Sequence, residues 1–200
     1  MAEAHSTPTD WLFDRCAGHL ALDFANAVSD RHTSSPIDRI PTYAALLSFA
    51  RQCELAPPAQ LRRLERRAAA DRDAAAAVRD QAASLRDALY RLFAAIASER
   101  AVDPADLAVF NRALDRMRLG RDLEWEWAAG SDALDAMLGP IVRAALDLLR
   151  SPERGRIRLC DADDCVWLFL DTSKNRSRRW CDMKQCGNRN KVRRFYQRQR

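Results

Sequence analysis

Long apolar runs and a secretion signal are both missing from this sequence of 200 residues. No stretch approaches the roughly eighteen consecutive apolar residues that a membrane-spanning helix needs. The first ten residues, MAEAHSTPTD, have neither the basic segment nor the apolar segment of a signal peptide. We therefore expect a cytoplasmic protein with no membrane partner, whose thiols stay reduced.

A recognisable catalytic constellation is also lacking. The segment from Gly18 to Asp30 is mostly apolar, yet four polar residues would share one face of a helix: His19, Asp23, Asn26 and Asp30. A histidine and an aspartate four residues apart occur in catalytic sites, but no nucleophile or second base can be identified beside them. We therefore do not expect an enzyme. The stripe either lines a pocket for a small-molecule effector, formed by His19, Asp23 and Asn26, or satisfies buried backbone groups.

Helical periodicity dominates the first 150 residues. Hydrophobic residues make up 48% of the chain, enough for a substantial core. Thr42 and Asp103, the latter followed by a proline, are typical helix caps. Gly139 and Pro140 should kink or split the last helical region. The expected helices cover residues 18–30, 42–54, two lengths between 58 and 100 that meet near 71–73, 104–117, and 131–150.

Two short segments depart from this helical pattern. Leu123, Trp125 and Trp127 alternate with glutamates, which predicts a β-hairpin over about 116–127 with a one-sided aromatic face. Residues 151–155, SPERG, are typical of a linker. We expect a mainly α fold with small β additions (α+β), with a helical domain over 8–150 and a separate module over 156–200.

Cysteine is scarce, and four of the six cysteines are concentrated in the last forty-one residues with a repeated spacing. Cys160 and Cys165 form one x4-spaced pair, and Cys181 and Cys186 form the other. Two short loops of this kind deliver the four soft ligands that zinc binds in a tetrahedron. The alternatives are two disulfides, or cysteines that serve as small hydrophobes. Cys16 and Cys53 are not spaced like ligands, so we expect core hydrophobes there, with a redox sensor as a remote option.

The positive charge is concentrated in the same module. The chain has a formal net charge of +5, but residues 151–200 hold 14 basic against 6 acidic residues, while the rest hold 19 against 22. Between residues 173 and 200 the count is 11 basic residues and one acidic residue. Such a block is typical of a segment that binds a polyanion, although a solvated charged tail would have the same composition.

The order of elements around the cysteines is typical of a treble-clef zinc finger. Strands are expected over 156–159 and 166–170, a turn over 171–175, a returning strand over 177–180 and a helix from about 187. This order places two thiolates in a first loop and two at the beginning of a helix, where the helix dipole favours negative charge.

Two segments carry a family resemblance. The run from Asp171 to Cys181, DTSKNRSRRWC, and the tetrapeptide Cys186-Gly187-Asn188-Arg189 closely resemble the CGNR zinc-finger family. The segment Gly18–Phe24, GHLALDF, resembles the helical ABATE domain that precedes the finger in that family. The resemblance implies a stress-induced bacterial transcription regulator whose four cysteines bind one zinc ion per chain.

We expect DNA to be the partner, bound by basic and amide side chains of the module. Guanidinium groups fit phosphate oxygens and guanine edges, and asparagine fits adenine. Asn188 and Arg189 have rival structural roles, as a helix cap and as a donor to the carbonyls of the finger. Structured RNA or a protein partner are the alternative ligands. We also expect association with the nucleoid and a homodimer formed through the long helices. The predicted nucleic-acid contacts are Arg176, Arg178, Arg179, Asn188, Arg189, Lys191, Arg193 and Arg194.

Overall fold

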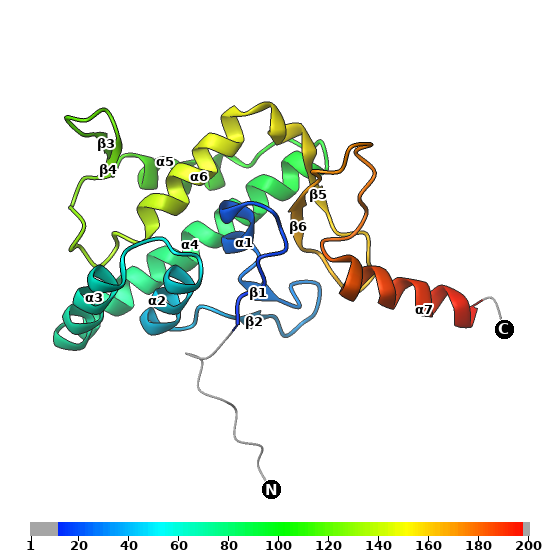
Figure 1. Cartoon of the computed structure of the whole chain (residues 1–200), viewed down its shortest axis with the longest axis horizontal. Helices are drawn as coiled ribbons and strands as arrows, with labels where there is room; N and C mark the ends of the chain where they lie inside the picture. The colour runs from blue at the N-terminus through cyan, green and yellow to red at the C-terminus, as the bar shows by residue number, and fades with distance from the viewer. Residues whose placement is uncertain (1–11, 198–200) are drawn as a thin grey trace, which may run out of the picture.

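The computed structural model describes residues 12–197, apart from the side chain of Arg194. Residue 8, the expected start of the helical domain, and the basic residues Arg198 and Arg200 lie outside the described residues. Within them the chain is mainly helical with small antiparallel strand pairs, as the sequence predicts (Figure 1). No helix in this part of the chain is long and apolar enough to cross a membrane.

We call residues 12–150 the helical part. The long helix α4 (Arg72–Ala97) is central to it. Three shorter helices pack around α4: α1 (Leu20–Ala25), α2 (Tyr43–Gln52) and α3 (Pro58–Ala70) (Figure 1). Thr42 accepts a hydrogen bond from the N–H of Ala45 and so caps α2 as expected. Asp71 ends α3 and caps α4 by accepting from the N–H of Ala74. The expected pair of helices that meet near residue 71 is therefore confirmed.

Helix α1 is shorter than the sequence predicts, and the expected helix over 18–30 is wrong. Gly18 takes a positive φ of 76° before the helix, and Asn26 ends it. The chain then forms a strand, β1 (Val28–Ser29), which pairs antiparallel with β2 (Ile37–Asp38). The predicted polar stripe is divided because Asp30, with a φ of 53°, follows this strand.

The predicted hairpin is present, but its aromatic face is only partly buried. After α5 (Pro104–Leu114), strand β3 (Met117–Leu119) pairs antiparallel with β4 (Trp125–Trp127). Trp127 is buried, whereas Trp125 is 43% exposed and Leu123 is 74% exposed. The buried indole lies so close to Gly139 that a Cβ there would meet its ring at 3.2 Å, so this contact favours glycine.

The last helix of this part, α6 (Leu138–Arg150), begins later than expected and is continuous. Residues 131–137 form turns instead of helix. Gly139 and Pro140 lie in the first turn of α6, where the N–H that proline lacks would have no partner within the helix. The expectation of a helix over 131–150 that is interrupted at these residues is wrong for this reason.

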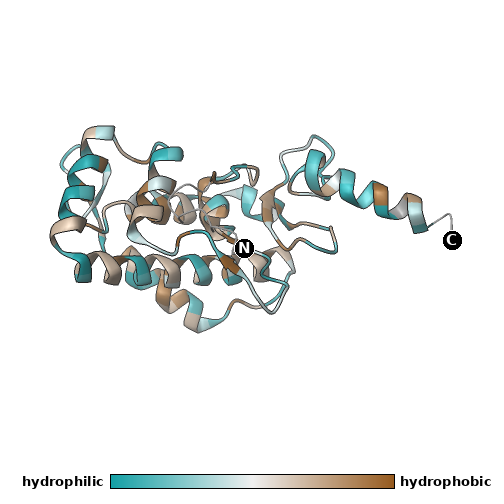
Figure 2. Cartoon of the chain, turned by 90° about the horizontal axis from the view of Figure 1, so that it is seen from below, coloured by the Kyte–Doolittle hydropathy of each residue, from teal (hydrophilic) through white to brown (hydrophobic). Residues whose placement is uncertain are grey.

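The C-terminal part contains one strand pair, two short turns of helix and a final α-helix. Strand β5 (Ile157–Leu159) follows the turn η1 (Pro152–Arg156) and pairs antiparallel with β6 (Leu168–Leu170). The returning strand expected over 177–180 is wrong, because both edges of β6 are occupied. One edge pairs with residues 157–159, and on the other edge Asn26 bonds to the backbone of Leu168 and the N–H of Leu170 donates to the carbonyl of Ala17. The π turn η2 (Met183–Gly187) leads into α7 (Asn188–Gln197), which projects away from the helical part (Figures 1 and 2).

Strand β6 has two buried faces, which join the two parts of the chain. Leu168 and Leu170 belong to the large helical core together with Ile157 of β5. Phe169 points to the other face and packs with three of the cysteines in a second, small cluster. The strand is therefore shared between the helical core and the cysteine cluster.

Candidate metal centre and nucleic-acid interface

Cys160, Cys165, Cys181 and Cys186 come together, and their sulfur atoms lie within 4.8 Å of one another. The Sγ atoms of Cys165 and Cys181 are 3.7 Å apart, as are those of Cys181 and Cys186. A tetrahedron with zinc–sulfur bonds of about 2.3 Å has sulfur atoms about 3.8 Å apart. None of the four is in a disulfide. The four cysteines fit one zinc ion.

Hydrogen bonds from backbone N–H groups, to a carbonyl in one loop and to a carboxylate in the other, shape the two loops that present the cysteines. The first loop connects β5 to β6, and the N–H of Cys160 donates to the carbonyl of Trp167 at 2.8 Å. In the second loop Asp182 accepts hydrogen bonds from the N–H groups of Lys184 and Gln185 at 2.6 and 3.0 Å. The β5–β6 strand pair therefore preorganises the first cysteine pair, and the turn capped by Asp182 preorganises the second.

The four thiols are close enough to perturb one another's pKa values. Hydrogen bonds from Cys165 and Cys181 lower the pKa of the Cys160 thiol to about 2. The hydrogen bond to Cys160 raises the pKa of Cys165 to about 12, and contacts with neighbouring thiols, Cys16 first, raise that of Cys181. A divalent ion at this cluster would displace the thiol protons and hold all four sulfurs as thiolates.

The tetrapeptide Cys186-Gly187-Asn188-Arg189 forms a structural unit at the cluster. The side-chain amide of Asn188 donates to the carbonyl of Lys184 at 3.0 Å. The guanidinium of Arg189 donates to the Sγ of Cys186 at 3.3 Å and pairs with Asp164 at 3.4 Å. Both residues, predicted as nucleic-acid contacts with rival structural roles, thus have structural partners in the finger.

Arg178 also has structural partners. Its guanidinium donates to the carbonyl of Trp180 at 2.9 Å, to that of Cys16 at 3.1 Å and to that of Cys181. It also lies over the ring of Phe169, 4.7 Å from its centroid. The Arg178 side chain therefore links the segment before α1 to the second cysteine loop. Its guanidinium donates within the fold, unlike that of an arginine that is free to bind phosphate.

Three aspartates of the first cysteine loop pair with basic residues that the sequence analysis assigned to nucleic acid. Arg179 pairs with Asp161, and Arg193 pairs with Asp164 at 2.9 Å and with Asp163 at 3.8 Å. The composition of this loop, CDADDC, shows the acidic residues, but their pairing across the finger depends on the tertiary fold. Arg176 and Lys191 are exposed, and the side chain of Arg194 lies outside the described part.

Cys16 is a cluster neighbour that the sequence analysis missed. It packs against the small cysteine cluster, and a hydrogen bond with Cys181 lowers the pKa of its thiol. Cys53 packs against the helical core, as expected. No local signal in the sequence identifies Cys16, because it lies 144 residues before the first ligand and is brought there by β6.

The predicted effector stripe is divided between a surface hollow and the interior. His19 and Asp23 line an open hollow of about 450 Å³ together with Gly18 and Cys53. Burial lowers the pKa of His19 and raises that of Asp23 to about 7. Asn26 is 2% exposed, and its amide pairs with both backbone groups of Leu168, at 2.8 and 2.9 Å. Asn26 therefore satisfies buried backbone groups and does not line the hollow.

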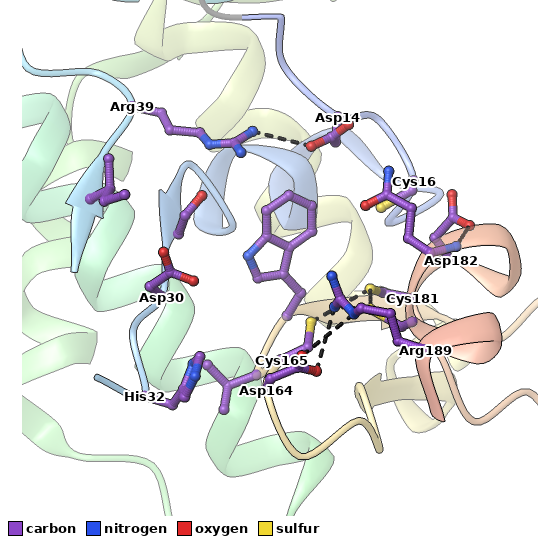
Figure 3. A pocket seen from close by; sticks show the side chains of 16 residues that line it. Asp14, Cys16, Asp30, His32, Arg39, Asp164, Cys165, Cys181, Asp182 and Arg189 are labelled. Carbon is purple, nitrogen blue, oxygen red and sulfur yellow. Dashed lines mark hydrogen bonds and ion pairs between the residues drawn. The ribbon is translucent and has the colours of Figure 1, made fainter. Parts of the chain in front are cut away.

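A second hollow, of about 230 Å³, lies where the helical part meets the cysteine loops. Its polar lining comes from both parts, and Figure 3 shows Arg39 beside Asp14 on one side and Arg189 beside Asp164 on the other. Arg39 pairs with Asp14 at 3.1 Å, and its guanidinium lies 5.6 Å from the ring centroid of Trp167. This hollow joins the segment before α1, the β1–β2 region and both cysteine loops.

Comparison with protein families gives two adjacent matches in the order of the two parts. Residues 156–199 match the CGNR zinc finger. Residues 18–152 match ABATE, which is described as "Putative stress-induced transcription regulator". A search of the curated proteins found no match. The chain belongs to the ABATE family and carries a CGNR zinc finger after the ABATE region.

Proposed function

We propose that the protein is a DNA-binding transcription regulator in which the zinc finger, of treble-clef type, presents α7 to the DNA. The observation that carries this proposal is the helix itself. It projects from the body (Figure 1), and Arg189, Lys191 and Arg193 lie along it without an acidic residue between 188 and 197. A helix of this charge and exposure fits the negative surface of a duplex.

The zinc ion has a structural role in this proposal. Cys186 lies in the turn that leads directly into α7, so a closed tetrahedral site would fix the direction of the helix. Arg189 donates to the sulfur of this ligand and would offset part of the negative charge that four thiolates bring to a divalent ion. Loss of the metal would therefore loosen the base of the DNA-contacting element.

The helical part would supply the input of the regulator, as a sensing or dimerising domain in the cytoplasm and at the nucleoid. Of the two hollows, the one between the helical part and the finger is better placed for an effector. Arg189 lines it and also contacts Cys186 and Asp164. A molecule that displaced Arg189 from these partners would alter the position or charge of α7.

Binding of duplex DNA, RNA of the same sequence and a zinc-free control, measured at several salt concentrations, tests the proposal. We expect duplex affinity to fall steeply with salt, with a log–log slope of about 0.9 per phosphate contact. Lys191→Ala and Arg193→Ala should each flatten the slope by about one unit. Arg118→Ala, which removes a 58% exposed side chain from the β3–β4 hairpin, is the matched control.

Two outcomes would contradict a DNA-binding function, and a third would contradict the structural role of zinc. Preference for RNA would assign the finger to RNA. Affinity that ignores salt and both substitutions while zinc is retained would assign it to a protein partner. Equal affinity with and without zinc would remove the role given to the metal.

A further inference from the structure

Three apolar side chains are exposed on α7, a helix whose other residues are polar or charged. Val192, Phe195 and Tyr196 are 55%, 58% and 63% exposed. Their spacing of three and four residues places them on one face of the helix. The rings of Phe195 and Tyr196 touch edge to face, with centroids 5.7 Å apart, so they form one continuous apolar surface.

Cationic residues lie on both sides of this apolar face. At about 100° per residue, Arg189 and Arg193 follow Tyr196 around the helix, and Lys191 lies beyond Phe195 on the opposite edge. Arg189 and Arg193 are 49% and 46% exposed, so a phosphate can reach them in competition with Asp163 and Asp164. The helix thus has an apolar centre between two cationic edges.

This arrangement limits the chemistry of the partner. Its surface must combine two rows of negative charge with apolar groups between them. The major groove of a duplex has this pattern, with phosphates on both edges and the C5-methyl groups of thymine on its floor. An α-helix fits the width of that groove.

We propose that α7 lies in the major groove with Val192, Phe195 and Tyr196 against the C5-methyl groups of thymine. The cationic edges hold the phosphates of the two strands, and the apolar face reads the methyl groups. This inference rests on the proposed DNA-binding function and adds to it a preference for thymine. The apolar face of α7 is the specificity-determining surface, and the flanking cations supply affinity without regard to sequence.

The experiment uses the zinc-loaded full chain and two duplexes that differ only in the methyl group. Fluorescence anisotropy compares a 20-base-pair alternating dA·dT duplex with the same duplex carrying deoxyuridine in place of thymidine. We expect the uracil duplex to bind more weakly by about fourfold for each methyl group buried. C5-methylation of cytosine in a G·C duplex should raise its affinity by a similar factor, because it adds the same group to the groove floor.

Substitutions assign the effect to the helix. Val192→Ala with Phe195→Ala should weaken binding of the thymine duplex and reduce the preference for thymine over uracil, since only Tyr196 of the apolar face remains. Arg193→Ala should weaken both duplexes and preserve their ratio. Leu119→Ala, which truncates a 54% exposed side chain on the distant β3–β4 hairpin, should change neither. Zinc content and helicity of each variant confirm that the fold is retained.

The results that would overturn the inference are distinct from those that would overturn DNA binding. Duplex binding that ignores the methyl groups, or a double variant that prefers thymine as strongly as the natural chain does, would reject the methyl contact alone. The absence of duplex binding at low salt would reject the proposed function. The double variant could instead lose binding to phosphatidylglycerol vesicles, or lose self-association, with its duplex affinity unchanged. The apolar face of α7 would then bind a lipid surface or a second copy of the chain.

Discussion

Asn26 takes the place of a neighbouring strand for Leu168. Its side-chain amide is buried and forms one hydrogen bond to each backbone group of that residue. Asn26→Ala would leave a buried N–H and a buried carbonyl without these partners, each at a cost of about 1–3 kcal/mol. We expect urea denaturation to show a free energy of unfolding lower by about 2–5 kcal/mol. Asn111→Ala, at an exposed position, should change it by less than about 0.5 kcal/mol, and an equally small effect at Asn26 would contradict the role given to its amide.

Asp23 should make stability depend on pH. Burial raises the pKa of its carboxyl from 3.8 to about 7, against the hydrogen bond that it accepts from the N–H of Ala17. Between these values the folded chain holds a proton that the unfolded chain has released, so the stabilising contribution is lost as pH rises from about 4 to 7. Asp23→Asn removes this loss, and its stability relative to the natural chain should rise across that window by on the order of 2 kcal/mol. Urea denaturation of both proteins from pH 4 to 8 measures the difference between their free energies of unfolding. A difference that stays constant over this range would contradict a raised pKa of the Asp23 carboxyl.

The first cysteine loop is acidic and α7 is basic, so the two segments attract each other. Asp163 and Asp164 neutralise Arg193 on the helix that we assign to DNA, so the loop competes with phosphates for the same guanidinium. Replacing both aspartates by asparagine should tighten duplex binding by about three- to tenfold, since exposed pairs are worth up to about 1 kcal/mol each. The salt dependence should also become steeper. Asp132→Asn, which breaks the pair with Arg63 in the helical part, is the control, and weaker binding by the double variant would contradict the competition.

The elements that sequence reasoning predicted are those whose signals are local. Thr42 and Asp103 cap the helices that follow them, and the cysteine spacing predicts the cluster, because each signal depends on residues a few positions apart. The errors occur where a distant partner decides the structure. Helix α1 ends at Asn26, whose amide pairs with β6, and residues 177–180 form no strand, because both edges of β6 are occupied.

The same distinction holds in the candidate site. The zinc ligands are recognisable from their spacing, whereas the partners of Arg178 are carbonyls of Cys16, Trp180 and Cys181 that only the folded chain brings together. The role of Arg189 beside the Sγ of Cys186 could be anticipated only as one of two alternatives. Charge density identifies a basic module, but it does not separate arginines that hold the fold from those that reach outward.

For the molecule as a whole, the boundary of metal-dependent structure should lie within the C-terminal part. Ile157, Leu168 and Leu170 belong to the helical core, so β5 and β6 should stay folded when zinc is chelated. The cysteine loops and α7 should unfold, because without the metal they are held mainly by exposed ion pairs, which stabilise little, and by hydrogen bonds within the loops. Hydrogen exchange should show that the amide of Leu170, which donates to the carbonyl of Ala17 at 2.8 Å, stays protected while that of Gly187 loses protection. Loss of protection at both amides would show that the metal supports the entire fold.

The shared strand β6 determines how the finger can be moved between proteins. A fragment that began at residue 156 would expose Leu168 and Leu170 to water and would leave the backbone of Leu168 without Asn26. A graft of these residues onto an unrelated protein would expose an apolar strand with an unpaired edge. We expect such a graft to aggregate before it could bind a partner. A transferable unit must therefore include the segment from Cys16 to Asn26, which supplies the carbonyl for Arg178 and the amide for β6. Recombination that separated these two pieces of chain would destroy the finger, so they should be inherited together.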